Sequence, residues 1–100
     1  MDNIYVLRDS PPESRFPFGT LVITTPAAEA LNRQDVARAL RRHAEGDWGD
    51  LSDDDREANE FALKQDERLL SAYRDRNGVK FWIITERDRS ATTVLLPEDY

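Results

Sequence analysis

The sequence of 100 residues contains no cysteine, which excludes disulfide bonds, cysteine-ligated zinc sites and thiolate nucleophiles. It also has no apolar run near the roughly 18 residues that a membrane-spanning helix needs, and no apolar segment typical of a signal peptide follows the first residue. We therefore expect one cytoplasmic domain over residues 1–100, without membrane association. Its hydrophobic content of 39% is sufficient for a modest core and argues against disorder.

Positive charge is in deficit, because 14 Lys and Arg residues face 20 Asp and Glu residues and the net charge is −6. Nucleic-acid-binding proteins usually carry a basic surface, so this class is disfavoured. The charges are nevertheless separated, since residues 32–43 are basic and residues 45–60 are acidic. Two interpretations stay open: the segments attract each other as solvated faces, or the acidic segment binds a basic surface of a partner.

The apolar pattern predicts an α+β fold in the order β-β-α-α-β-β-β. We expect an antiparallel sheet that ends in a three-stranded C-terminal meander, with two to three helices packed on one face. Residues 9–18 contain three prolines and are expected to form a loose connection. The expected strands cover residues 3–8, 19–25, 68–74, 79–85 and 92–96.

Capping residues indicate where the helices begin. Thr25 is the predicted N-cap of a first short helix, Asn32 that of a second helix ending at Gly46, and Ser52 that of a third. The second helix should bury one stripe, and the third should bury one face near its C-terminal half. The stripe consists of Val36, Ala39, Leu40 and His43, and the face of Ala58, Phe61, Ala62 and Leu63.

Asn77-Gly78 between two apolar runs is a strong β-hairpin signal. With these two residues as the turn, Asp75 would lie opposite Lys80, Tyr73 opposite Trp82, and Ser71 opposite Ile84.

The segment RRHAEGDWGD, residues 41–50, concentrates the residue types that could carry chemistry. His43 is the only histidine, and an acid–base role for it would use Asp47 and Arg89 as helpers. The alternative is structural: His43 completes the apolar stripe and forms a hydrogen bond near the helix C-terminus. A single histidine makes a metal site unfavourable, and we expect neither a metal nor another cofactor.

Three further features have two interpretations each. Trp48 either closes the core between two helices or anchors an interface. Arg87 and Arg89 either clamp a phosphate or carboxylate, or belong to a turn held by Asp88. The basic face of Arg38, Arg41 and Arg42 either stays solvated or binds nucleic acid. No phosphate-binding glycine loop, G-x-S-x-G or H-E-x-x-H motif is present.

The stretches RRHAEGDWGDLS, KFWIITERDRS and TTVLLPEDY, with TPAAEAL and RLLSAY, resemble a family of small bacterial "plasmid-related" proteins of plasmids and integrative elements. The resemblance covers residues 19–100 and departs at TPAAEAL, where the family has a glycine after the proline. It implies a mobile-element setting and no established activity. The characteristic positions are His43, Gly46, Asp47, Trp48, Asp55, Asn59, Arg89 and Ser90.

We therefore expect a small acidic accessory protein of a bacterial mobile element that binds another protein, with host defence or nucleic-acid processing as candidate targets. Its partner should present a basic surface; nucleic acid is a weaker candidate, and a homodimer stays open. A small hydrolase or toxin-like ribonuclease using His43 is the first alternative, and a nucleic-acid binder the second. The candidate binding residues are Trp48, Asp47, Asp50, Asp53, Asp54, Asp55, Arg87 and Arg89.

Overall fold

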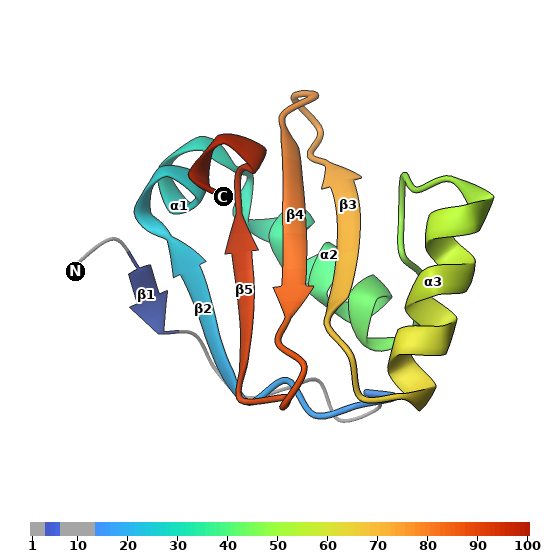
Figure 1. Cartoon of the computed structure of the whole chain (residues 1–100). Coiled ribbons are helices and arrows are strands. Elements are labelled where there is room, and N and C mark those ends of the chain that lie inside the picture. The colour runs from blue at the N-terminus through green and yellow to red at the C-terminus, as the bar shows by residue number, and fades with distance from the viewer. Residues whose placement is uncertain (1–3, 7–13) are drawn as a thin grey trace.

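The computed structural model describes residues 4–6 and 14–100, which form an α+β fold (Figure 1). The predicted fold class is confirmed. The elements, in chain order, are β1 (Ile4–Val6), β2 (Thr20–Thr24), α1 (Thr25–Ala30), α2 (Arg33–Ala44), α3 (Asp53–Lys64), β3 (Leu69–Arg74), β4 (Lys80–Thr85), β5 (Ala91–Leu95) and the short 3₁₀ helix η1 (Pro97–Asp99).

The five strands form one sheet in the order β1-β2-β5-β4-β3. The predicted antiparallel meander of β3, β4 and β5 is confirmed. The expectation of a wholly antiparallel sheet is wrong, because β2 pairs with β5 in parallel. Three helices and the first two strands of the meander separate these strands in sequence, so the direction of β5 is set by the meander and not by a turn from β2.

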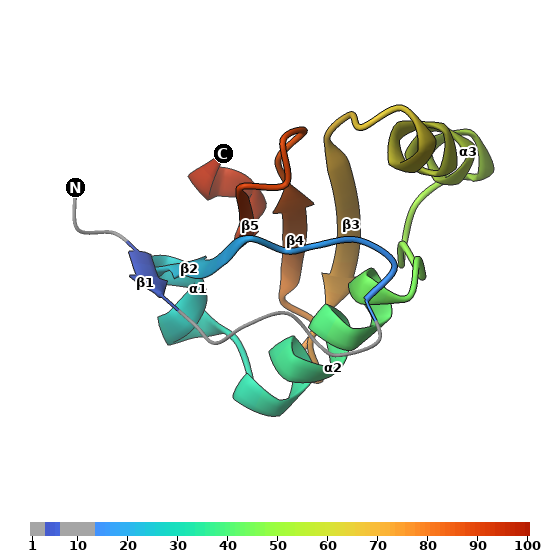
Figure 2. The same ribbon diagram turned by 90° about the horizontal axis from the view of Figure 1, so that it is seen from below.

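The helices do not all lie on one face of the sheet. α1 and α2 cover the same face, whereas α3 stands beside β3 and is displaced toward the other side (Figure 2). The predicted packing of two to three helices on one face is thus met by α1 and α2. The opposite sheet face therefore has no helix across its middle.

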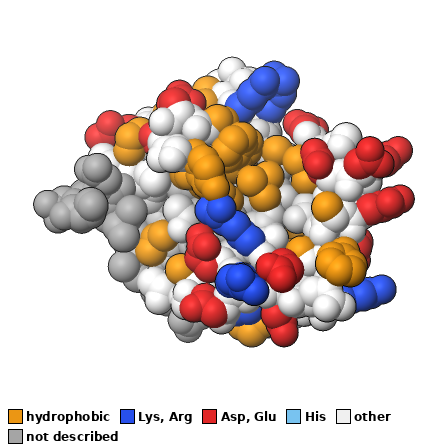
Figure 3. Space-filling view, viewed as in Figure 1, with side chains coloured by type: hydrophobic (Ala, Val, Ile, Leu, Met, Phe, Trp, Pro, Cys, Tyr) orange, Lys and Arg blue, Asp and Glu red, His pale blue; other side chains and the backbone are white. Residues whose placement is uncertain are grey.

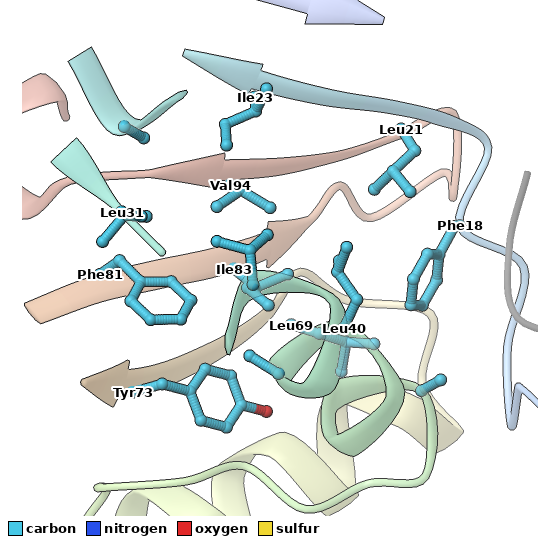
Figure 4. Packing of buried hydrophobic residues seen from close by; sticks show 14 of the residues in the cluster. Phe18, Leu21, Ile23, Leu31, Leu40, Leu69, Tyr73, Phe81, Ile83 and Val94 are labelled. Carbon is cyan, nitrogen blue, oxygen red and sulfur yellow. The ribbon is translucent and has the colours of Figure 1, made fainter. Parts of the chain in front are cut away.

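The main core lies between α2 and the covered face of the sheet (Figure 4). Leu40 of α2 packs there with Leu69, Ile83 and Val94 from three strands. Phe16 and Phe18 are also buried in this core. Residues 14–18 of the predicted loose connection are irregular, with two buried phenylalanine side chains; residues 9–13 lie outside the described residues.

The predicted caps are largely correct. The side chains of Asn32 and Ser52 accept hydrogen bonds from the backbone of α2 and α3 at 3.1 Å each. α1 begins one residue earlier than predicted, because Thr24 and not Thr25 is its N-cap. The hydroxyl of Thr24 accepts from the Ala27 N–H at 3.3 Å and donates to Asp99 at 2.7 Å, which fastens η1 to this corner.

The predicted hairpin register is wrong by one residue on the β4 side. Tyr73 pairs with Phe81 and Ala72 with Trp82. Asp75 and Val79 close the loop, since the Asp75 N–H donates to the Val79 carbonyl at 3.0 Å and Gly78 has φ +80°. The connection is thus a three-residue loop with glycine in the left-handed region, a common alternative to the two-residue turn.

Candidate functional site

His43 lies at the centre of a buried polar network. Its side chain is 0% exposed, and both ring nitrogens have partners. Nδ1 lies 2.5 Å from the hydroxyl of Ser71 on β3, and Nε2 lies 3.0 Å from the hydroxyl of Thr85 on β4. Phe16 and Trp48 pack edge-on against the ring, with centroids 5.3 and 5.6 Å away.

The hydrogen bonds place a proton on Nε2 of His43. The Phe18 carbonyl can only accept, so Thr92 donates its proton there at 2.8 Å. Thr85 then donates to Thr92 at 2.7 Å and accepts from Nε2–H of His43. In the neutral ring that burial favours, Nδ1 carries no proton and accepts from Ser71.

Burial lowers the pKa of His43 to about 3, and the nearby Arg89 guanidinium acts in the same direction. The ring is neutral at neutral pH, but no substrate reaches it, since solvent does not touch the side chain. This geometry supports the structural interpretation of His43 and speaks against its use as a general base.

Asp47 and Trp48 lie in the loop that connects α2 to α3. Arg42 donates two hydrogen bonds to the Asp47 carboxylate at 2.8 and 3.1 Å and thereby lowers the pKa of Asp47. Trp48 is only 3% exposed, and its indole N–H donates to Glu60 of α3 at 2.9 Å. Trp48 therefore closes the core, as one interpretation predicted, and is not available as an exposed interface anchor.

Two glycines allow this loop to approach its neighbours closely. Gly49 has φ +78°, and a Cβ there would lie 2.0 Å from the Ala72 carbonyl oxygen. Gly46 has φ +82°, and a Cβ there would lie 2.1 Å from the Arg15 guanidinium. Position 49 therefore needs glycine for conformation and for space, whereas position 46 needs it for conformation, since the Arg15 side chain can move aside.

Loop and helix together complete the outer edge of β3. Ala72 donates to the Trp48 carbonyl at 3.1 Å and accepts from the Asp50 N–H at 2.7 Å. Two residues away, the Asn59 side-chain amide does the same for Leu70, accepting from its N–H at 3.1 Å and donating to its carbonyl at 2.7 Å. An asparagine side chain thus replaces a neighbouring strand.

The position of Asn59 explains why the predicted buried face of α3 is only partly correct. Ala62 is buried and Leu63 half-buried, but Ala58 is exposed and Phe61 is 64% exposed. The helix is turned so that Asn59 and Ala62 meet the strand edge. The apolar pattern did not predict this orientation of α3, because the helix contacts β3 through the side-chain amide of Asn59.

Arg89 forms a clamp of carbonyl contacts. It has φ +59°, and its guanidinium donates to the carbonyls of Glu67 at 2.6 Å, Glu86 at 3.1 Å and Ala62 at 3.4 Å. These bonds join the end of α3 to the β4–β5 turn, so Arg89 is committed to the fold. The Ser90 N–H donates to Asp88 at 3.0 Å, which confirms the turn interpretation. Arg87 is exposed beside Glu67.

The candidate acidic residues remain on the surface. Asp53, Asp54, Asp55 and Glu57 are exposed on the N-terminal half of α3, and none forms an ion pair among the described residues. Asp50 precedes them and lies 3.9 Å from Arg74. These residues are here called the acidic face. Asp50 and Asp53–Asp55 are thus exposed to solvent, whereas His43 and Trp48 are buried.

The sheet face opposite α2 is an apolar surface that motif analysis did not identify. Hydrophobic side chains gather over its middle, and acidic side chains lie along the border on the side of α3 (Figure 3). Trp82 is half-buried there and packs edge-on against Tyr100, which is 68% exposed. Period-two alternation in β4 could have placed Trp82 on this face.

Among residues 4–6 and 14–100, no three His, Asp or Glu side chains are grouped so that they could hold a metal ion. In the same part of the chain no helix is long and apolar enough to cross a membrane. No family model, no curated protein and no solved structure matches this chain.

Proposed function

We propose that this protein acts by binding another protein, and that the acidic face contacts a basic surface of that partner. The observation that carries the proposal is the contrast in how charged side chains are used. Asp47, Glu60 and Asp35 each hold an arginine. The carboxylates at the start of α3 hold none within the described chain.

The chemistry of the acidic face supports this use. Asp53, Asp54 and Asp55 follow the Ser52 cap, so the positive end of the helix dipole stabilises their negative charges. Opposite charges on a partner would accelerate association and select against other acidic surfaces. A target in host defence or nucleic-acid processing, and a mobile-element setting, rest on the family resemblance alone.

The test is quantitative affinity capture from the source organism with the tagged full chain. The variant Asp53→Asn/Asp54→Asn/Glu57→Gln removes charge from the acidic face without changing side-chain size. The matched control Glu29→Gln/Glu98→Gln removes exposed charges elsewhere. We expect a stoichiometric partner with the wild type and the control, about tenfold weaker capture with the variant, and weaker capture as salt screens the charges.

Two outcomes would contradict the proposal. One is that no partner is recovered in stoichiometric amount. The other is that the acidic-face variant and the control capture the same partner equally well. Thermal unfolding of each variant shows that the fold is retained, since loss of helix-dipole contacts should cost about 0.3–1 kcal/mol per charge.

A further inference from the structure

A second surface lies between α2 and the β3–β4 hairpin, and it adjoins the acidic face at Asp50. It is a hollow of about 270 Å³, whose floor includes Tyr73 and Ala39. Four arginines from two separate parts of the chain line it: Arg38 and Arg42 of α2, and Arg74 of β3 with Arg76 of the hairpin loop. Each pair is close in sequence, and the fold brings the two pairs together.

Two aspartates in the hollow hold this arrangement together. The Asp35 carboxylate is 8% exposed and accepts from the Arg76 backbone N–H at 2.7 Å, from its Nε at 3.0 Å, and from Arg38 Nη1 at 2.9 Å. Asp75 is 5% exposed and accepts three backbone N–H groups, from Asn32, Asn77 and Val79. Asp35 thus orients Arg38 and Arg76, whereas Asp75 fixes the hairpin loop against the start of α2.

The arginines keep donors that the protein does not use. Among the described residues, Nε and Nη2 of Arg38 and Nη1 of Arg76 have no hydrogen-bond partner. Arg74 has only the ion pair with Asp50 at 3.9 Å. Arg42 is held by Asp47, with its guanidinium carbon 4.8 Å above the Tyr73 ring. The groups that line the hollow carry four positive and two negative charges, with Asp47 and Asp50 beside them.

We propose that this hollow binds the phosphate group of a small phosphorylated molecule. Guanidinium groups match phosphate oxygens with paired hydrogen bonds, and three of them here come from fixed positions. A volume of about 270 Å³ accepts a phosphate and part of what carries it. A long polyanion fits less well, because the acidic face and the net charge of −6 repel it. This inference does not depend on the proposed protein interface.

The test is titration of the intact protein with inorganic phosphate, with adenosine monophosphate and with a short duplex oligonucleotide at low salt, followed by NMR of backbone amides and arginine Nε–H groups. The variant is Arg38→Gln/Arg74→Gln, whose side chains are 62% and 56% exposed; when Arg38 is replaced, the buried Asp35 carboxylate keeps its hydrogen bonds to Arg76. The control is Arg41→Gln, an exposed arginine of α2 that does not line the hollow.

We expect saturable shifts at residues 35–42 and 74–76 with phosphate and with the nucleotide. Affinity should fall about tenfold or more in the double variant and less than about twofold in the control, as expected for the loss of charge-assisted hydrogen bonds. Equal losses in Arg41→Gln, or shifts that do not saturate at the hollow, would overturn the proposal. Oligonucleotide binding tighter than nucleotide binding would overturn it in favour of a nucleic-acid surface.

Discussion

α2 and α3 each span 12 residues, and each begins at a side-chain cap. α2 buries a full stripe that includes Val36, Leu40 and His43, whereas α3 buries only Asn59 and Ala62. The first helix is attached by apolar packing and a buried hydrogen-bond network. The second is attached at a strand edge by one amide, the Trp48–Glu60 bond and the Arg89 clamp.

This difference separates stability from recognition. A helix that is attached along one narrow line keeps most of its circumference in water, so its sequence is free to carry acidic residues. The residues that resemble a catalytic set, His43, Asp47 and Arg89, form contacts within the fold instead. The histidine and tryptophan that stand out in the sequence are therefore buried and stabilise the fold. The candidate binding residues for a protein partner are the exposed carboxylates of the acidic face.

Replacing His43 on α2 should have the largest effect. The substitution His43→Ala removes a buried ring and leaves the hydroxyls of Ser71 and Thr85 without it. We expect a loss of about 3–5 kcal/mol in the free energy of unfolding, measured by urea denaturation. Glu57→Ala on α3 is the control and should change it by less than about 0.5 kcal/mol. A small loss for His43→Ala would show that α2 does not depend on the network.

As pH falls, the free energy of unfolding should decrease first through protonation of His43 on α2, and only at lower pH through the ion pairs. His43 has a pKa of about 3 when folded and 6.5 when unfolded, so the unfolded chain binds a proton first as pH falls. Stability is complete above pH 6.5 and declines below it by about 1.4 kcal/mol per pH unit.

The carboxylates titrate in a lower range. Arg76 holds the pKa of Asp35 at about 2, and Arg15 lowers that of Glu60 from 4.5, so their contributions are lost only at lower pH. Unfolding measured between pH 6.5 and 4.5 isolates the histidine. The variant His43→Gln should show a flatter profile in that range. An unchanged slope in this variant would assign the acid sensitivity to other groups.

A smaller effect is expected at the attachment of α3. The substitution Asn59→Ala removes both side-chain hydrogen bonds to Leu70, and the expected loss is about 1–3 kcal/mol. Hydrogen exchange at the Leu70 amide should accelerate at the same time. Ala58→Ser, one residue away and exposed, is the matched control. Unchanged protection of Leu70 would mean that α3 does not need its amide contact.

Local signals in the sequence predicted the elements well. The caps Asn32 and Ser52, the stripe of α2 and the C-terminal meander follow from neighbouring residues, which alone determine capping and periodicity. The hairpin register failed because the Asp75 side chain and backbone select a longer loop than Asn-Gly alone indicates.

The long-range features could not be predicted in the same way. The parallel pairing of β2 with β5, the amide of Asn59 at the β3 edge, and the meeting of Arg76 with Asp35 all join distant parts of the chain. The candidate acidic face was visible in the sequence because its residues are consecutive. The arginine hollow was not visible in the sequence, since α2 and the hairpin loop, which both line it, are far apart along the chain.

The closed edge of β3 has a consequence for the protein in a crowded solution. A strand with bare N–H and C=O groups is a template on which another chain can grow a β-ladder. Here the 48–50 loop and Asn59 already form hydrogen bonds with the outward N–H and C=O groups of Ala72 and Leu70. A second molecule therefore cannot pair with β3 at these positions. A side chain at position 49 would push this loop away from β3 and so open that edge to pairing with another molecule.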